Sequence, residues 1–263
     1  MSTSQPAAPR PSATVAVVRD GKGAPEILLV RRRAGDAFGN AYTFPGGVVD
    51  HDESNAHIVC EGRTTEEANA ILEVDDGLDY YSAAIRELFE ETGVLLARDA
   101  DGNWPADTAA YAEQRVAVDR AELAWPDFLK NEGLCMASDA LHYFAWWETP
   151  VDYPKRWSAR FFAAALPPGQ VARHDGKELT DSRWLTARDA LALREAGELK
   201  LPQPTRRNLA LMADFDSVEA LLGWARSRHR EGIPKITPVY VVVDGRELWP
   251  IPGDPHYPAD NSL

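Results

Sequence analysis

Short runs of apolar and β-branched residues recur along the chain, separated by turn sequences. Residues 14–18 and 27–30 form two such runs, and Asp20-Gly21-Lys22-Gly23 between them is typical of a turn. This arrangement predicts a β-hairpin. Residues 42–44 predict a short strand that ends at Pro45-Gly46-Gly47, and later strands are predicted at residues 140–147, 161–166 and 239–243.

Helical spacing of apolar residues is clearest at residues 81–92, where Ala84, Ile85, Leu88 and Phe89 fall on one side. Gly93 is placed to end this helix in a left-handed turn. Further helices are predicted at residues 65–72, 106–129 (open to an interruption at Pro126), 188–196, 205–213 and 217–228. Alternating strands and helices, without an internal repeat or an evident linker, predict an α/β layered fold.

The chain is expected to hold a single domain at residues 13–258, between a disordered lead-in at 1–12 and a tail at 259–263. No stretch reaches the roughly 18 uninterrupted apolar residues of a membrane helix. Two cysteines, Cys60 and Cys135, have no metal-binding spacing and cannot form a disulfide framework. We therefore expect a cytoplasmic protein with no membrane partner.

Acidic residues are concentrated in the middle of the chain. The formal net charge is −13, from 28 basic and 41 acidic side chains. Residues 48–150 alone carry 23 acidic and six basic side chains, a net −17. Such a region repels extended nucleic acid, so no nucleic-acid partner is expected. It is suited to divalent cations, although for most of these carboxylates solubility is the simpler explanation.

Three glutamates stand out within the predicted helix at residues 81–92. Glu87, Glu90 and Glu91 are spaced i, i+3 and i+4, so their carboxylates project from one helix face and repel one another. Arg86 is placed to reach Glu90, but one cation does not neutralise three anions. Mg²⁺ prefers such oxygen ligands, whereas a solvated acidic face is the alternative explanation.

The residues around these glutamates resemble the Nudix box. Phe44-Pro45-Gly46-Gly47 is followed by Glu53, and Arg86-Glu87-Leu88-Phe89-Glu90-Glu91-Thr92-Gly93-Val94 supplies the helical part. The thirty-two residues 54–85 lie between Glu53 and Arg86, twenty-five more than in the family pattern. An interrupted box is similar to that of the peroxisomal coenzyme A diphosphatase-like subgroup. Loops tolerate such insertions, since each doubling of length adds only about 0.6 kcal/mol of closure entropy.

Segments outside the box are also similar to that subgroup, so that the resemblance spans residues 14–258. These segments lie at residues 38–47, 148–162, 201–205 and 252–258. The resemblance implies an α/β/α sandwich around a mixed sheet, with an insertion at residues 54–82 and an elaborated C-terminal region. For the insertion, a lid, a dimer contact and a tolerated surface excursion all stay open, as does a homodimer.

The resemblance also implies an activity, the hydrolysis of a diphosphate linkage by water with Mg²⁺ or Mn²⁺. Glu90 and Glu91 are then expected to bind metal, with Glu87 as ligand or base. The carbonyl of Gly47 is a further expected ligand, because glycine allows backbone to approach an ion closely. Arg86 is expected to orient helix and loop through Glu53.

Less specific candidates complete the predicted site. Glu178 is the first choice for a further acidic residue from a later loop, with Glu148 and Asp152 as rivals. Within the run of arginines at residues 31–33, alternation turns only some side chains inward; Arg31 and Arg33, together with Arg160, are the predicted phosphate contacts. At least two of Trp146, Trp147 and Trp157 are expected in the core rather than stacked on a base.

Three functions follow from this site. The first is hydrolysis of coenzyme A or acyl-coenzyme A. The second is the same chemistry on another small-molecule diphosphate, such as ADP-ribose, NADH, a nucleotide sugar or a dinucleoside polyphosphate, since a fold does not choose a ligand. The third is a non-catalytic binding or regulatory module, against which the complete set of mutually repulsive glutamates argues.

Overall fold

The first apolar run forms the centre of a mixed β-sheet. The computed structural model describes residues 7–35 and 39–258. In it, β1 (Arg10–Arg19) pairs antiparallel with β2 (Glu26–Arg32) and parallel with β9 (Trp157–Ala165). The predicted hairpin is therefore confirmed.

Five further strands complete this sheet: β3 (Tyr42–Thr43), β4 (Gly46–Val48), β8 (His142–Glu148), β10 (Leu179–Thr186) and β11 (Lys235–Ile236). The strand order is β10-β2-β1-β9-β8-β11, with β3 paired to β2 and β4 paired to β1. β4 brings Gly47 opposite Ala13 of β1. Gly46 and Gly47 thus lie beside β1, the central strand of the sheet.

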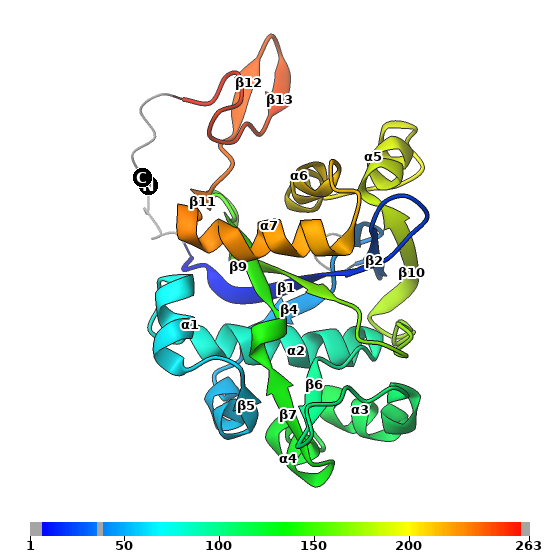
Figure 1. Cartoon of the computed structure of the whole chain (residues 1–263). Helices are drawn as coiled ribbons and strands as arrows, with labels where there is room; N and C mark the ends of the chain where they lie inside the picture. The colour runs from blue at the N-terminus through cyan, green and yellow to red at the C-terminus, as the bar shows by residue number, and fades with distance from the viewer. Residues whose placement is uncertain (1–6, 36–38, 259–263) are drawn as a thin grey trace.

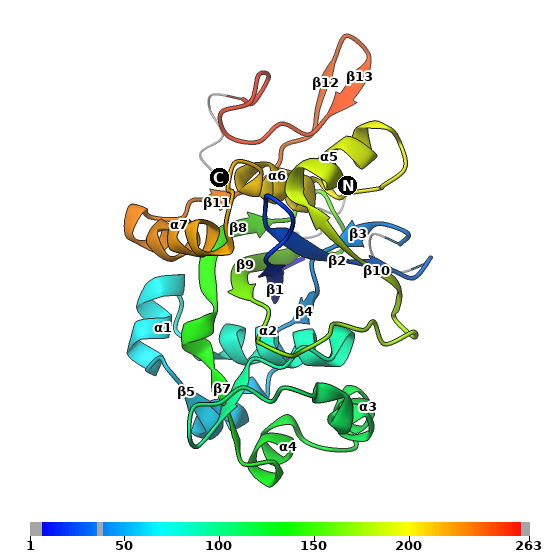
Figure 2. The ribbon, with the colours of Figure 1, turned by 45° about the vertical axis from the view of Figure 1, so that its right-hand side comes forward.

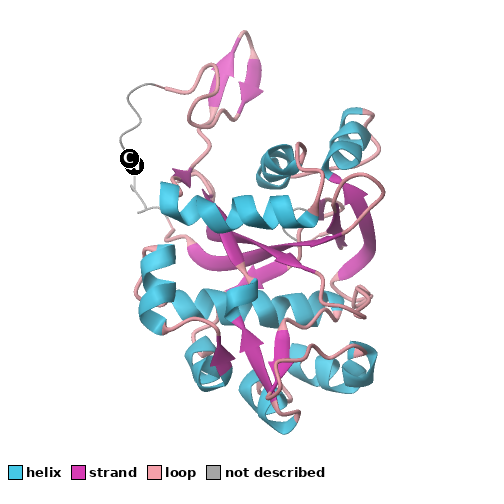
Figure 3. Ribbon diagram, viewed as in Figure 1, coloured by secondary structure: helices cyan, strands magenta, loops and turns pink. Residues whose placement is uncertain are grey.

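Alternation along β1 divides the core into two halves. Ala13, Val15 and Val17 pack on the side of α2 (Gly77–Thr92), whereas Ala16 and Val18 face the other side. That second side is covered by α5 (Ala187–Glu195), α6 (Gln203–Met212) and α7 (Val218–Glu231). Figures 1 and 3 show the sheet between these two helical layers. The predicted α/β/α sandwich around a mixed sheet is confirmed.

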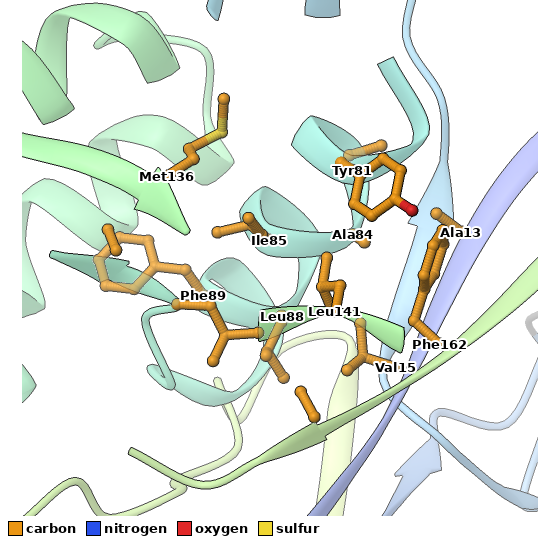
Figure 4. Packing of buried hydrophobic residues seen from close by; sticks show 14 of the residues in the cluster. Ala13, Val15, Tyr81, Ala84, Ile85, Leu88, Phe89, Met136, Leu141 and Phe162 are labelled. Atoms are coloured by element: carbon orange, nitrogen blue, oxygen red, sulfur yellow. The ribbon is translucent and has the colours of Figure 1, made fainter. Parts of the chain in front are cut away.

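The apolar side of α2 anchors the glutamate-bearing helix. Ile85, Leu88 and Phe89 are fully buried, and Figure 4 shows them directed into the core shared with Val15 and Phe162. Phe89 also stacks on Phe128, with ring centroids 5.1 Å apart. Each such side chain contributes roughly 1.5–3 kcal/mol by its burial. The opposite, acidic face is therefore held on a rigid element.

The insertion is an integral part of the fold. It contains η1 (Glu53–Val59), β5 (Cys60–Glu61) and α1 (Thr65–Leu72), which confirms the predicted helix at 65–72. Thr64 and Glu67 form a capping box at the start of α1. Residues 77–82 of the predicted insertion belong instead to α2, which begins at Gly77.

Buried side chains tie the insertion to the rest of the molecule. Ala68 and Leu72 of α1 are buried against the α2 side of the core. β5 pairs with β7 (Leu134–Ala137), which also pairs with β6 (Ala97–Asp99), so the insertion completes a second, three-stranded sheet. A tolerated surface excursion, one of the alternatives left open by the sequence, does not describe this segment.

Two further expectations about local structure are wrong. The predicted helix at 106–129 is three short helices, and the break lies at residues 120–124, where Ala121 has φ +54°. Pro126 lies instead in the first helical turn, where its missing N–H is harmless. The three elements are η2 (Thr108–Tyr111), α3 (Ala112–Asp119) and α4 (Trp125–Asn131).

The ends of the chain also differ in part from expectation. β1 begins at Arg10, so residues 10–12 of the predicted lead-in form a strand, while residues 1–6 and the tail at 259–263 lie outside the described residues. β12 (Val241–Val243) pairs with β13 (Arg246–Leu248) in a hairpin that stands away from the main sheet (Figure 2). A short helix, η3 (Ser138–Ala140), precedes β8. No helix in the described part of the chain has the length and hydropathy to cross a bilayer.

Candidate active site

The acidic face of α2 lies against β4, the strand that begins with Gly46 and Gly47. The helix ends at Thr92, and Gly93 follows with φ +72°, as its position in the sequence predicts. Glu87, Glu90 and Glu91 lie in the last two turns, with side-chain exposures of 16%, 12% and 4%. Three carboxylates are thus withdrawn from solvent on one helix face.

Both glycines are required by this contact. A Cβ on Gly46, whose φ is +146°, would lie 2.3 Å from the Ala13 carbonyl oxygen. A Cβ on Gly47 would lie 2.2–2.4 Å from the carboxylate atoms of Glu87. The Gly46 amide also donates a hydrogen bond to Glu91 Oε2 at 2.8 Å. The pair therefore lets β4 approach both β1 and the acidic helix face.

Arg86 joins the two halves of the interrupted sequence pattern. Its Nε donates to Glu53 Oε1 at 2.8 Å, and its Nη1 lies 3.2 Å from both carboxylate oxygens of Glu90. Glu53 is buried and also accepts a hydrogen bond from Ser82 Oγ at 2.5 Å. The contact between Glu53 and Arg86 expected from the sequence is present, although thirty-two residues intervene.

Arg32 forms a second cationic centre beside Glu91. Its Nη2 donates to Glu91 Oε1 at 3.0 Å and to the Gly46 carbonyl oxygen at 2.5 Å, and its Nη1 donates to Glu178 Oε1 at 2.8 Å. Glu178 is thus brought to the edge of the glutamate cluster. Side chains alternate between the two faces of β2, and Arg32 lies on the same face as Val30, which packs toward α2. This is why Arg32, rather than Arg31 or Arg33, reaches the glutamates.

The other arginines predicted to contact phosphate lie elsewhere. Arg31 is on the opposite side of β2, with its Nε 3.0 Å from Thr180 Oγ1, and Arg33 is exposed. Arg160 is 1% exposed beneath α1, where its Nη2 donates to the Leu72 carbonyl oxygen at 3.0 Å. Its guanidinium carbon lies 3.5 Å from the ring centroid of Trp146, so Arg160 is a core residue.

The rival acidic residues are also remote from the cluster. Glu148 pairs with Arg156 at 3.2 Å and with Lys235 at 3.3 Å, and Asp152 is exposed. Trp147 is buried and donates from Nε1 to Asn208 Oδ1 at 3.1 Å. Trp146 packs on Arg160, so two of the three tryptophans are engaged within the fold, as expected.

Burial makes the site carboxylates unusually basic. Burial raises the pKa of Glu87 to about 8, with Arg86 opposing the shift and Glu91 and Glu90 adding to it. Burial likewise raises the pKa of Glu91 to about 7 against the opposing charge of Arg32. The pKa of Arg86 is raised despite its burial, because Glu53, Glu87 and Glu90 surround it. Two guanidinium groups thus face six carboxylates, those of Asp50, Glu53, Glu87, Glu90, Glu91 and Glu178.

This excess of negative charge fits a divalent cation in its donor chemistry. Hard ions such as Mg²⁺ take carboxylate and carbonyl oxygens, and Glu87, Glu90, Glu91 and Gly47 supply them. Among the described residues, no three His, Cys, Asp or Glu side chains converge on one point. In this arrangement Arg86 pairs with Glu87 and Glu90, and Arg32 pairs with Glu91.

No protein-family profile matches the chain, but individual known proteins are similar to it. The chain is 25% identical over 278 residues to acyl-coenzyme A diphosphatase NUDT19 of Xenopus laevis, covering 90% of this chain and 73% of that protein. It is 24% identical over 243 residues to putative nudix hydrolase 7 of Caenorhabditis elegans, covering 90% and 71%.

A solved structure is similar to the chain in both fold and sequence. The crystal structure of a NUDIX hydrolase from Alicyclobacillus acidocaldarius matches with a TM-score of 0.73 at 28% identity, covering 82% of this chain and 96% of that one. In both sequence and fold the chain is similar to the Nudix hydrolases. These similarities support a Nudix-type diphosphatase, and the sequence relationship is to the coenzyme A diphosphatase-like members. Nudix hydrolases generally use divalent metals such as Mg²⁺ or Mn²⁺.

Reasoning from sequence missed three contributors to the cluster. Arg32 was detectable, because Leu28, Val30 and Arg32 fall on one strand face. Ser82 holds Glu53 from within a segment assigned to the insertion. The backbone amide of Gly46 carries no side-chain signal at all.

Proposed function

We propose that this Nudix hydrolase is a divalent-metal-dependent diphosphatase that acts on coenzyme A or acyl-coenzyme A. The observation that carries the proposal is the buried acidic face of α2, held against Gly47 and joined to Glu53 through Arg86. The similarity to proteins named acyl-coenzyme A diphosphatase supports the substrate class.

We assign Mg²⁺ or Mn²⁺ to the oxygens of Glu87, Glu90, Glu91 and the Gly47 carbonyl. The ion would neutralise phosphate charge and lower the pKa of a bound water. The Glu87 carboxylate lies directly against Gly47, so we assign it as ligand or as the base that accepts a proton from water.

The arginines beside the glutamates act as positioning residues in this proposal. Arg86 holds the helix and the Glu53 segment together, and Arg32 holds Glu91, Glu178 and the Gly46 carbonyl in one arrangement. Glu178 is our candidate for the additional acidic residue. A substrate contact by Arg31 or Arg33 stays a prediction, whereas the burial of Arg160 argues against one.

A turnover assay tests the proposal. Purified protein with Mg²⁺ or Mn²⁺ is incubated with coenzyme A, ADP-ribose, NADH and diadenosine polyphosphates. Release of 3′,5′-ADP and phosphopantetheine from coenzyme A is the expected result. If only other compounds of the panel are cleaved, the protein is a diphosphatase with a different substrate. Tight binding without any product would favour a non-catalytic module.

A substitution links turnover to the acidic face. Glu87→Gln is expected to abolish metal-dependent turnover and leave the thermal unfolding midpoint within a few degrees of wild type, because the change is nearly isosteric. Glu219→Gln is the matched control, since Glu219 is exposed on α7 across the sheet. Full activity in Glu87→Gln would remove Glu87 from the site.

Three expectations from the sequence stay predictions. They are a cytoplasmic location, the absence of a nucleic-acid partner, and a homodimer as one outcome for the assembly state. Cys60 and Cys135 are both free thiols, in keeping with a reducing compartment. Sedimentation of the purified protein would decide the assembly state.

A further inference from the structure

We propose that a cavity at the C-terminal end of α2 binds a phosphate monoester of the substrate, apart from the diphosphate that is hydrolysed. This inference rests on the proposed function. The cavity has a volume of about 140 Å³ and opens between the end of α2, the η2–α3 segment and residues 169–173. Its lining includes Gly93, Ala109, Ala112, Arg115, Gly169 and Arg173.

The size of the cavity suits a compact anion. A water molecule takes about 30 Å³ in the liquid, so the space accepts a group larger than one or two waters. Small residues form much of the wall, and Gly93 is part of it. A Cβ on Gly93 would lie 3.2 Å from Arg115 Nη1, so the glycine leaves room for the guanidinium.

Arg115 lines the cavity and has one guanidinium nitrogen without a partner among the described residues. Its Nε donates to the Glu90 carbonyl oxygen at 2.9 Å, which fixes the guanidinium at the end of α2. Its Nη2 is buried and has no hydrogen-bond partner among the residues that the structure describes. Arg173 adds a second cation, and its backbone amide donates to the Thr92 carbonyl oxygen at 2.7 Å.

Asp107 is part of the cavity lining, and Asp119 and Asp175 lie near Arg115, but each of these carboxylates already has a partner. Asp107 accepts from the Ala109 amide at 3.1 Å, and Asp119 pairs with Lys177 at 2.9 Å. Asp175 accepts from the amides of Glu178 and Leu179 at 2.9 and 2.8 Å. A buried guanidinium donor therefore stands without an acceptor, and phosphate is an anion whose geometry guanidinium matches with paired hydrogen bonds.

The cavity adjoins the glutamate cluster. Glu90 and Glu91 directly precede the lining residues Thr92 and Gly93, and Arg115 contacts the Glu90 carbonyl itself. The chain from Arg173 leads to Glu178, which pairs with Arg32 beside Glu91. Those five residues span at most roughly 17 Å when extended. The substrate class in this proposal therefore carries both a diphosphate and a separate phosphate monoester, as coenzyme A and NADPH do.

Matched substrate pairs test the inference. The pairs are coenzyme A with 3′-dephospho-coenzyme A, and NADPH with NADH, which differ by one phosphate each. For at least one pair, wild type should favour the phosphate-bearing member in kcat/KM by roughly tenfold to a hundredfold, the range of a hydrogen-bonded charge pair. Ala112→Asp and Arg115→Gln should bring that ratio close to one, through KM.

The control variant places the same charge elsewhere. Ala112 is the exposed first residue of α3, where an aspartate suits the helix N-terminus, and Ala220→Asp adds an exposed aspartate in the first turn of α7 across the sheet. Ala220→Asp should retain the wild-type ratio. A ratio near one in wild type, or an unchanged ratio in both cavity variants, would overturn the inference.

A binding measurement separates this inference from the proposed function. Calorimetric titration with 3′,5′-ADP and 5′-AMP, without metal and in Glu87→Gln protein, needs no turnover. Tighter binding of 3′,5′-ADP that is lost in Ala112→Asp supports the cavity even if no diphosphate in the panel is cleaved. Equal binding of the two nucleotides, or binding of inorganic phosphate that 3′,5′-ADP does not displace, would contradict a substrate phosphate in this cavity.

Discussion

Replacing Gly47 by alanine should lower turnover and leave the stability of the fold almost unchanged. The new Cβ would lie 2.2 Å from Glu87 Cδ and 2.3 and 2.4 Å from its two carboxylate oxygens. Carbon atoms in ordinary contact are about 3.5 Å apart, so the Glu87 carboxylate must move by roughly 1 Å. A misplacement of that size lowers turnover by about a hundredfold, and we expect this loss in kcat of Gly47→Ala.

Stability should change little in the same variant. The backbone of Gly47 lies outside the left-handed region, and the atoms that must move belong to a side chain that can rotate. The free energy of unfolding, measured with urea, should therefore stay within about 1 kcal/mol of wild type. Steady-state kinetics on the substrate found in the panel gives kcat.

Two other glycines are the controls. Gly46→Ala places a Cβ 2.3 Å from the backbone oxygen of Ala13 at φ +146°, so it should destabilise the fold itself. Gly223→Ala, within α7 and with no atom within 4 Å, should stabilise by up to about 1 kcal/mol and keep full activity. Wild-type kcat in Gly47→Ala, or a loss of activity matched by a loss of stability, would refute the reasoning.

Three further predictions concern stability. Arg86→Ala should lower the free energy of unfolding by about 3 kcal/mol, because it strands the buried Glu53 carboxylate, whereas Arg188→Ala in an exposed pair should change it by under about 0.5 kcal/mol; equal urea midpoints for the two would contradict this. Burial lowers the pKa of His142 to about 4. Below pH about 6.5, His142 is therefore protonated in the unfolded chain but not in the folded one. Between pH 7.5 and 5 the free energy of unfolding should fall by about 1–2 kcal/mol more in wild type than in His142→Gln. Parallel pH profiles of the two proteins would exclude this role. Deleting residues 56–78 removes buried Ala68, Leu72 and Leu78, and should leave a chain without a cooperative thermal transition; an unchanged midpoint would restore the view of a surface excursion.

The acidic helix is predictable from sequence because its evidence is local. The spacing of Ile85, Leu88 and Phe89, the glycine at position 93 and the charge pattern all lie within one segment. The contact between Arg86 and Glu53 is predictable only through the family resemblance, since thirty-two residues separate them. Alternation along β2 predicts that Arg32 faces the glutamates, once it is known which face of the strand is buried.

Other features depend on tertiary contacts that no local pattern carries. β10 is an edge strand with the polar sequence Thr180-Asp181-Ser182-Arg183, so it lacks the apolar signal that marks β1. β7 has four residues, and its partners lie far along the chain in β5 and β6. The burial of Arg160 depends on α1, Tyr143 and Trp146 meeting around it.

The most direct test of the account is a crystal structure of the protein with Mn²⁺, read from the anomalous signal of the metal. We predict an ion within about 2.0–2.3 Å of carboxylate oxygens from Glu87, Glu90 and Glu91 and close to the Gly47 carbonyl, and its loss in Glu87→Gln crystals. An ion bound elsewhere, with Glu87 still directed at Gly47 and Arg86 unchanged, would contradict the central claim.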